Sequence, residues 1–151
     1  MGRISTLVIS RLKECPGDIK TVAHWYYQEW DCRNTTATAL DTIDQITKFD
    51  ERIGFVAHIN GKPVGAAEIS FVKSSSCPDC KNWIDGIYVL KPYRGIGVSD
   101  ALIKYAILEA KALNLVVLHL RCEEHLIRLY EKYGFKVISQ DGCKFVMELE
   151  I

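Results

Sequence analysis

A short loop that contains two glycines is the strongest candidate for chemistry in this sequence. It reads Arg94-Gly95-Ile96-Gly97-Val98-Ser99 and lies between an expected strand, ended by Pro92, and an expected helix. A helix N-terminus leaves backbone N–H groups unpaired and carries partial positive charge. Glycines let a ligand approach these groups closely, and the arginine adds a charged fork that suits phosphate. The loop therefore indicates an anion site, most naturally one for a diphosphate.

Two common phosphate-binding motifs do not fit this loop. The P-loop pattern G-x-x-x-x-G-K-[ST] is absent, and Asp100 stands where the third glycine of the G-x-G-x-x-G fingerprint belongs. That fingerprint also follows the first strand of its domain, whereas this loop follows the fourth expected strand. On the loop alone, an ordinary strand-to-helix turn that uses glycine for tightness explains the residues equally well.

The cysteines offer a second candidate site in Cys77-Pro78-Asp79-Cys80. One C-x-x-C pair supplies two of the four ligands that a structural zinc needs, and no second pair follows at suitable spacing. We expect a tight loop with two reduced thiols. The alternative is a zinc site completed by another subunit or by a histidine, with Cys122 and His125 as candidates. The other cysteines are Cys15, Cys32 and Cys143.

Composition limits the classes of function. Lys plus Arg and Asp plus Glu number 19 each, so no net field favours nucleic acid or an anionic membrane. No apolar stretch approaches the roughly 20 residues of a membrane helix. Because the N-terminus lacks the apolar core of a signal peptide, we expect a cytoplasmic protein. Residues 1–6 fit the myristoylation pattern, but residues 3–12 read better as a strand.

The hydrophobic pattern predicts one domain over residues 1–151, in the order β-α-α-β-β-β-α-β-α-β-β. Asn60-Gly61 is a strong hairpin signal, and the strand–helix–strand pattern of residues 82–120 predicts a parallel crossover at the centre of the sheet. Asp18 is expected to be the N-cap of the first helix. The predicted strands are 3–12, 54–60, 63–72, 82–90, 115–120, 135–139 and 144–150, and the predicted helices are 19–30, 36–48, 99–113 and 123–133.

Three segments together resemble the GCN5-related N-acetyltransferase (GNAT) superfamily: Trp83–Val89, Pro92–Val98 and Leu129–Phe135. The superfamily signature is Arg/Gln-x-x-Gly-x-Gly/Ala, and Ser99 replaces its last small residue. Ser is small and is able to cap a helix, so the departure is mild. The resemblance implies an α/β (α+β) fold with a mixed sheet of about seven strands and about four helices. It also implies acetyl-CoA as co-substrate and no required metal.

The resemblance assigns the cofactor site residue by residue. The strand before the loop would pair with the pantetheine arm through the backbone of Ile87, Tyr88 and Val89. The N–H of Ile87 or Val89 would polarise the thioester carbonyl. The diphosphate would lie on the N–H groups of the loop, which are those of Arg94, Gly95, Ile96, Gly97, Val98 and Ser99.

The same resemblance nominates the catalytic groups. Tyr130 would protonate the departing thiolate, or would merely pack in the core. Many members carry Asn seven residues earlier, where this chain has Glu123, so that contact to the pantetheine arm is in doubt. Asp85, expected on the same face as Ile87 and Val89, is the first candidate for the base that deprotonates the amine. Glu68 on the neighbouring strand is its rival.

The acceptor is the least defined partner. The first two helices hold aromatic and acidic residues that suit a small cationic amine, although a buried aromatic face with a solvated acidic face explains them as well. Peptide amines are a second class of possible acceptor. A homodimer is one expected assembly of the chain. A non-catalytic acyl-CoA-binding module is the rival function. The residues concerned are Trp25, Tyr26, Tyr27, Glu29, Trp30, Asp31, Asp41 and Asp44.

Overall fold

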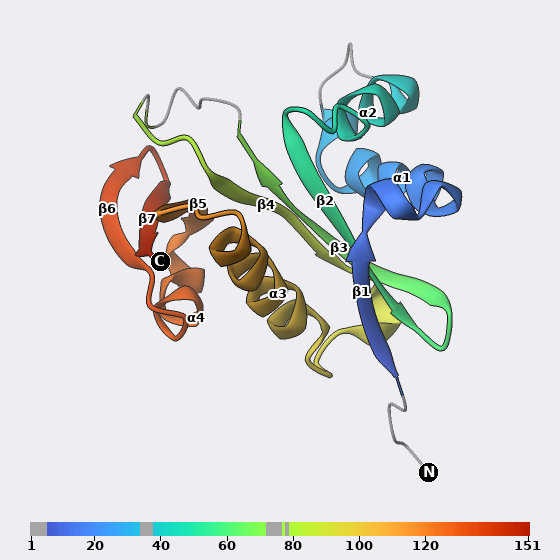
Figure 1. Ribbon diagram of the computed structural model, residues 1–151. Helices are drawn as coiled ribbons and strands as arrows, with labels where there is room; N and C mark the ends of the chain where they lie inside the picture. Colours follow the sequence, from blue (N-terminus) through green and yellow to red (C-terminus); the bar gives the residue numbers. More distant parts are fainter. Residues whose placement is uncertain (1–5, 34–37, 72–76, 78) are drawn as a thin grey trace.

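Seven strands form one mixed β-sheet in the computed structural model, in the order β1-β2-β3-β4-β5-β7-β6 (Figure 1). The structure describes residues 6–33, 38–71, 77 and 79–151. β4 and β5 run parallel, and the other neighbouring strands are antiparallel. The strands are β1 Leu7–Arg11, β2 Arg52–Ile59, β3 Lys62–Ser70, β4 Trp83–Val89, β5 Val117–Glu123, β6 Lys136–Asp141 and β7 Lys144–Glu150.

Helices cover both faces of the sheet. α1 and α2 lie together on one face, while α3 crosses the other face and connects β4 to β5 (Figure 1). Short 3-10 turns flank several of these elements. None of the helices in the described part of the chain is long and apolar enough to cross a membrane. The helices are α1 Ile19–Glu29, α2 Ala39–Ile46, α3 Val98–Ala112 and α4 Ile127–Glu131.

The observed elements confirm the predicted fold class and element order. The hairpin at Asn60-Gly61 forms with Ile59 opposite Lys62, and α3 makes the expected parallel crossover. Several predictions fall outside the described residues. These are the beginning of the first strand with the myristoylation pattern, the beginning of the second helix, residue 72 of the third strand, and most of the loop before Cys80.

Asp18 stands at the N-cap position of α1, as expected, but its side chain makes no capping bond. Its Oδ2 instead contacts His58 Nε2 at 2.7 Å. The helix predicted to begin at Ser99 begins one residue earlier, at Val98, and its N-cap is Gly97.

Two hydrophobic clusters hold the layers together. The larger one, the α3 cluster, packs α3 on the sheet through side chains such as Leu102, Ala106 and Phe55. The smaller one packs α1 on the opposite face through side chains that include Trp25 and Tyr26. Of the residues of β4, Ile87 and Val89 contact the larger cluster and Tyr88 contacts the smaller one. Successive side chains of β4 therefore lie on different faces of the sheet.

Candidate functional site

β4 and β5 diverge almost as soon as they meet. In the described part of the chain their only paired residues are Trp83 and His119, next to a 2.7 Å bond from the His119 N–H to the Asn82 carbonyl. At its other end β4 is held by β3, where the Leu90 N–H donates to the Val64 carbonyl at 2.8 Å. Alternate N–H groups along a strand point to opposite sides. Those of Val89 and Ile87 therefore point away from β3, toward the side of β5.

A β-bulge interrupts β4 between Asp85 and Tyr88. Tyr88 pairs with Ala66 and Asp85 with Glu68, so two residues of β4 lie opposite the single residue Ala67. Gly86 has φ +62°, and its N–H donates to Asp85 Oδ1 at 2.8 Å. Such a bulge shifts the alternation of side chains between the two faces.

The bulge corrects one sequence prediction. We expected Asp85 on the face of Ile87 and Val89, which pack against the α3 cluster. Because directly opposed residues of neighbouring strands share a face, Asp85 lies on the face of Glu68 instead. Both candidate bases therefore belong to the face that carries α1, which simple alternation along β4 would not reveal.

Gly86 gives a prediction about stability. A Cβ at this position would lie 2.7 Å from the Tyr26 hydroxyl oxygen, in addition to the strain of the positive φ. Gly86→Ala should therefore lower the free energy of unfolding by about 2–4 kcal/mol in chemical denaturation. Gly142→Ala is the matched control, because its φ is +61° and nothing lies within 4 Å of its Cβ.

We expect this control to lose only about 1–2 kcal/mol for the backbone. Adding Tyr26→Phe to Gly86→Ala should restore part of the difference, since the hydroxyl oxygen is the nearest atom. Equal losses at the two glycines would show that Tyr26 does not press on the bulge.

Glu68 is a buried carboxylate with an unusual proton affinity. Its side chain is 6% exposed, and its Oε2 accepts a 2.8 Å bond from Arg52 Nη1. Burial raises the pKa of Glu68 to about 7, against the opposing effect of the Arg52 charge. The negative charges of Asp85 and Asp31 raise this pKa further. Glu68 is thus able to exchange a proton near neutral pH, while Asp85 is exposed to solvent.

Tyr130 lies on α4, half-buried against the α3 cluster and edge-on to Phe135 at 6.2 Å between ring centroids. Burial raises the pKa of Tyr130 to about 12, with smaller contributions from Cys122 and Asp85. The phenol therefore keeps its proton at neutral pH and is able to act as a donor. The negative charge of Asp85 raises the pKa of both Tyr130 and Glu68.

The glycine loop leads directly into α3. Gly95 and Gly97 have φ +80° and +95°, and no atom lies within 4 Å of a Cβ built on either. Glycine is therefore required by the backbone conformation, and the space beside the loop is open. The first intrahelical bond runs from the Ala101 N–H to the Gly97 carbonyl at 3.0 Å. The N–H groups before Ala101 have no acceptor within the helix.

The Arg94 side chain binds this loop to the end of β4 that is not paired with β5. Its Nε donates to the Val89 carbonyl at 2.7 Å, and its guanidinium carbon is 5.7 Å from the centre of the Tyr88 ring. The exposed guanidinium is thus fixed near both the helix N-terminus and the free edge of the strand. The structure brings together the sequence-predicted loop and strand, which are adjacent in the chain.

The predicted acceptor residues separate into packed and available groups. Trp25 is buried and stacks on Tyr88 at 5.3 Å between centroids, whereas Trp30 is 40% exposed. Asp41 belongs to the capping box of α2, and Asp31 accepts a 2.6 Å bond from the Thr42 hydroxyl. These two carboxylates have structural partners, so the packed reading of the first helices explains much of their composition.

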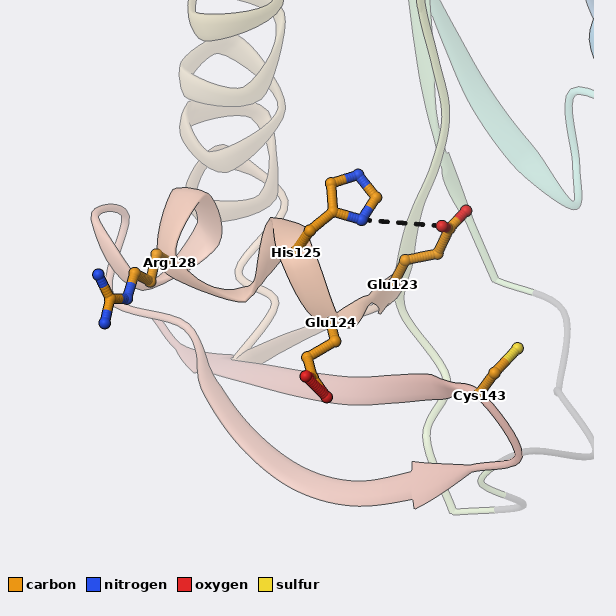
Figure 2. A pocket seen from close by; sticks show the side chains of 5 residues that line it. All are labelled: Glu123, Glu124, His125, Arg128 and Cys143. Atoms are coloured by element: carbon orange, nitrogen blue, oxygen red, sulfur yellow. Dashed lines mark ion pairs between the residues drawn. The ribbon is translucent and has the colours of Figure 1, made fainter.

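Sequence reasoning missed a pocket at the end of β5, with a volume of about 540 Å³. Its side chains come from the end of β5, the turn and helix that follow, and the β6–β7 turn (Figure 2). No motif joins such scattered residues, so the sequence carries no signal for it. Glu123 therefore belongs to the wall of this pocket, where its Oε2 is 3.8 Å from His125 Nδ1. The lining residues are Glu123, Glu124, His125, Arg128 and Cys143.

Cys77 and Cys80 form a disulfide, so the prediction of two free thiols is wrong here. Their Cα atoms are 5.3 Å apart, which is within the usual range for this bond. The close approach follows from a turn in which the Cys80 N–H donates to the Cys77 carbonyl. No three His, Cys, Asp or Glu side chains of the described residues are grouped so that they could hold a metal ion.

The comparison with protein families agrees with this architecture. The model of the Acetyltransferase (GNAT) family matches residues 19–135, which is more than half of the chain. The chain belongs to this family, and it is an enzyme of the acetyltransferase class. No curated protein sequence matches it.

Solved structures show the same fold at low sequence identity. A ribosomal-protein-alanine N-acetyltransferase from Brucella melitensis is 19% identical with a TM-score of 0.74, over 95% of this chain and 99% of that chain. A GNAT-family acetyltransferase from Streptococcus pneumoniae is 20% identical with a TM-score of 0.70, over 97% and 100%. PaiA N-acetyltransferase from Thermoplasma acidophilum, solved in complex with coenzyme A, is 14% identical with a TM-score of 0.64, over 97% and 99%.

Proposed function

We propose that this protein transfers the acetyl group of acetyl-CoA to the primary amine of a small cationic acceptor. The observation that carries the proposal is the divergence of β4 from β5 beside the N-terminus of α3. A site for an extended acyl carrier must provide backbone hydrogen-bond donors along the arm of the carrier and positive charge beside its phosphates. This chain offers both within one strand–loop–helix unit.

The residues on this unit fit acetyl-CoA as a substrate. The backbone of Ile87, Tyr88 and Val89 has an edge free of β5, with two N–H groups on that side. The open space beside Gly95 and Gly97 leaves room for a diphosphate against the loop, whose remaining members are Arg94, Ile96, Val98 and Ser99. A strand N–H at Ile87 or Val89 would stabilise negative charge on the thioester oxygen.

The groups that we assign to proton transfer lie on the two faces of β4. Glu68 has the pKa that suits a base at neutral pH, so we assign it the removal of the ammonium proton. Asp85, which lies opposite Glu68 and is exposed, would hold the ammonium group by charge. The neutral amine then attacks the thioester carbonyl within a ternary complex, and the C–S bond breaks as the amide forms. Tyr130 gives its proton to the departing sulfur, and the proton that the nitrogen loses on forming the amide restores the Tyr130 hydroxyl through solvent.

The support for a cationic acceptor is the exposed Asp85 carboxylate beside the bulge. The pocket at the end of β5 adds Glu123 and Glu124, whose charge Arg128 on the same wall offsets in part. A polypeptide N-terminus is the second candidate acceptor. The similarity in fold to the Brucella melitensis enzyme, a ribosomal-protein-alanine N-acetyltransferase, favours it.

Ligand-induced stabilisation tests the cofactor site. Acetyl-CoA at a hundredfold excess over its Kd should raise Tm by roughly 5–10 °C, because it binds the folded state only. Arg94→Ala should weaken the Kd of acetyl-CoA about tenfold, since it removes a charged donor. Lys111→Ala is the control, because this exposed lysine lies in the last turn of α3. An unchanged Tm in the parent protein would refute the site.

A further inference from the structure

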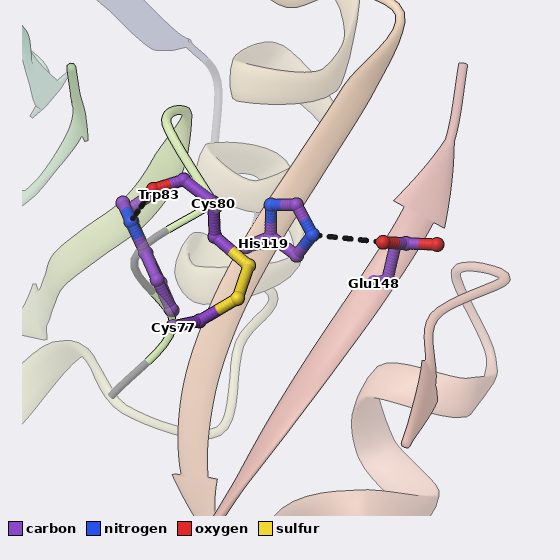
Figure 3. The surroundings of a disulfide bond; sticks show 5 residues. All are labelled: Cys77, Cys80, Trp83, His119 and Glu148. Atoms are coloured by element: carbon purple, nitrogen blue, oxygen red, sulfur yellow. Dashed lines mark hydrogen bonds and ion pairs between the residues drawn. A yellow bond between two sulfur atoms is a disulfide. The ribbon is translucent and has the colours of Figure 1, made fainter. Parts of the chain in front are cut away.

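The Cys77–Cys80 disulfide lies beside a buried histidine that has one unpaired ring nitrogen (Figure 3). His119 is 4% exposed, and its Nε2 is 2.9 Å from Glu148 Oε2. Its other ring nitrogen, Nδ1, is buried and has no hydrogen-bond partner among the described residues. Figure 3 shows this nitrogen on the side of Cys80, with Glu148 on the opposite side of the ring. Buried polar atoms without partners are rare and destabilise the form that contains them.

A reduced Cys80 would supply the partner that this nitrogen lacks. A carboxylate only accepts, so Nε2 carries a proton toward Glu148. In the neutral ring Nδ1 then needs a donor, and in the charged ring it needs an acceptor. A disulfide sulfur has no proton to give and is a poor acceptor. A reduced Cys80 meets either need, as a thiol that donates or as a thiolate that accepts.

The two cysteines also differ in accessibility. Cys80 is 3% exposed and belongs to a small buried cluster with Trp83 and Val146, whereas Cys77 lies at the edge of this cluster and is partly exposed. An external thiol is therefore able to reach Cys77 first. The Trp83 indole N–H, bonded to the Cys80 carbonyl at 3.1 Å, holds the inner cysteine in place.

We propose that Cys77–Cys80 is a thiol-exchange site for small-molecule thiols, in which the His119–Glu148 pair stabilises the Cys80 sulfur after its release. A thiolate attacks the Cys77 sulfur, the S–S bond breaks, and the electron pair leaves with Cys80. A second thiol attacks the sulfur of the bound small molecule and releases Cys77. Two small-molecule thiols are oxidised to one disulfide, and their two protons end on the protein cysteines.

The redox equilibrium of the intact protein tests this proposal. The chain is equilibrated in glutathione redox buffers, the free thiols are alkylated, and the mass shift is counted. The parent disulfide should open reversibly. His119→Gln should disfavour reduction by about tenfold in the equilibrium constant, which corresponds to about 30 mV. The Gln amide is able to replace the Nε2 contact to Glu148, but it has no group at the Nδ1 position.

Two further variants keep the test decisive. Glu148→Gln should shift the equilibrium in the same direction by a smaller factor. It removes the negative charge beside His119 Nε2 but leaves the His119 ring in place. His58→Gln removes a second histidine–carboxylate pair, with Asp18 at 2.7 Å, and should leave the equilibrium unchanged. Circular dichroism reports whether each variant folds.

Three results would overturn the proposal: a disulfide that no glutathione buffer opens, equal equilibria in the parent, His119→Gln and Glu148→Gln proteins, or stoichiometric zinc in the reduced protein. The thiol count does not depend on acetyl transfer. Failure of this site would therefore leave the proposed function untouched, and the reverse also holds.

Discussion

Tyr130→Phe should lower kcat by about a hundredfold or more and leave the Kd of acetyl-CoA nearly unchanged. The phenol is half-buried, and its pKa of about 12 keeps it protonated at any pH at which the enzyme would work. Phenylalanine keeps the ring and its edge-on contact with Phe135 but has no proton to give. Steady-state kinetics and calorimetric binding of acetyl-CoA measure the two effects separately.

Tyr105→Phe is the matched control for this change. Tyr105 also packs against the α3 cluster, in contact with Phe55, but lies outside the proposed proton path. Its variant should keep the parent kcat. If Tyr130→Phe and Tyr105→Phe behave alike, Tyr130 is a packing residue, and the departing sulfur takes its proton from elsewhere.

The second large effect concerns the pH dependence of kcat/KM, which reports the ionisations of the free enzyme. A base must be deprotonated to act, so kcat/KM should rise through one ionisation near pH 7 and level off above it, in line with the pKa of Glu68. Glu68→Gln should remove this step and lower the plateau by about a hundredfold. Asp85→Asn should move the step to lower pH, because the negative charge of Asp85 raises the pKa of Glu68.

Controls separate the enzyme's ionisation from that of the acceptor. The step should stay in place when acceptors with different amine pKa values are compared. Glu150→Gln, at the exposed end of β7, should leave the profile unchanged. A step that survives in Glu68→Gln would assign the base to another group, with Asp85 as the first candidate.

The fold could be predicted because its signals are local. The hairpin at Asn60-Gly61, the apolar residues of the predicted strand 115–120 and the glycines before α3 each specify a short stretch of backbone. Their order along the chain then limits the sheet to few topologies. The loop and strand of the candidate cofactor site were predictable for the same reason, since they follow one another in sequence.

The rest of the site depends on contacts between distant segments. The bulge at Gly86 moves Asp85 to the face of Glu68. The only signal of it in the residues of β4 is the glycine itself, since a glycine inside a strand is typical of a bulge. The pKa of Glu68 comes from burial and from Arg52, sixteen positions away. The Cys77–Cys80 bond and its neighbour His119 meet only through the pairing of β4 with β5.

Amine-dependent release of the CoA thiol tests the central claim most directly. Purified protein is incubated with acetyl-CoA and a panel of a polyamine, an aminoglycoside, free amino acids and a peptide with a free N-terminus, and free thiol is followed with time. We predict release that depends on both protein and amine, is fastest with a small cationic amine, and yields the N-acetylated product by mass spectrometry. Thiol release that no amine of the panel increases would contradict the proposed acetyl transfer.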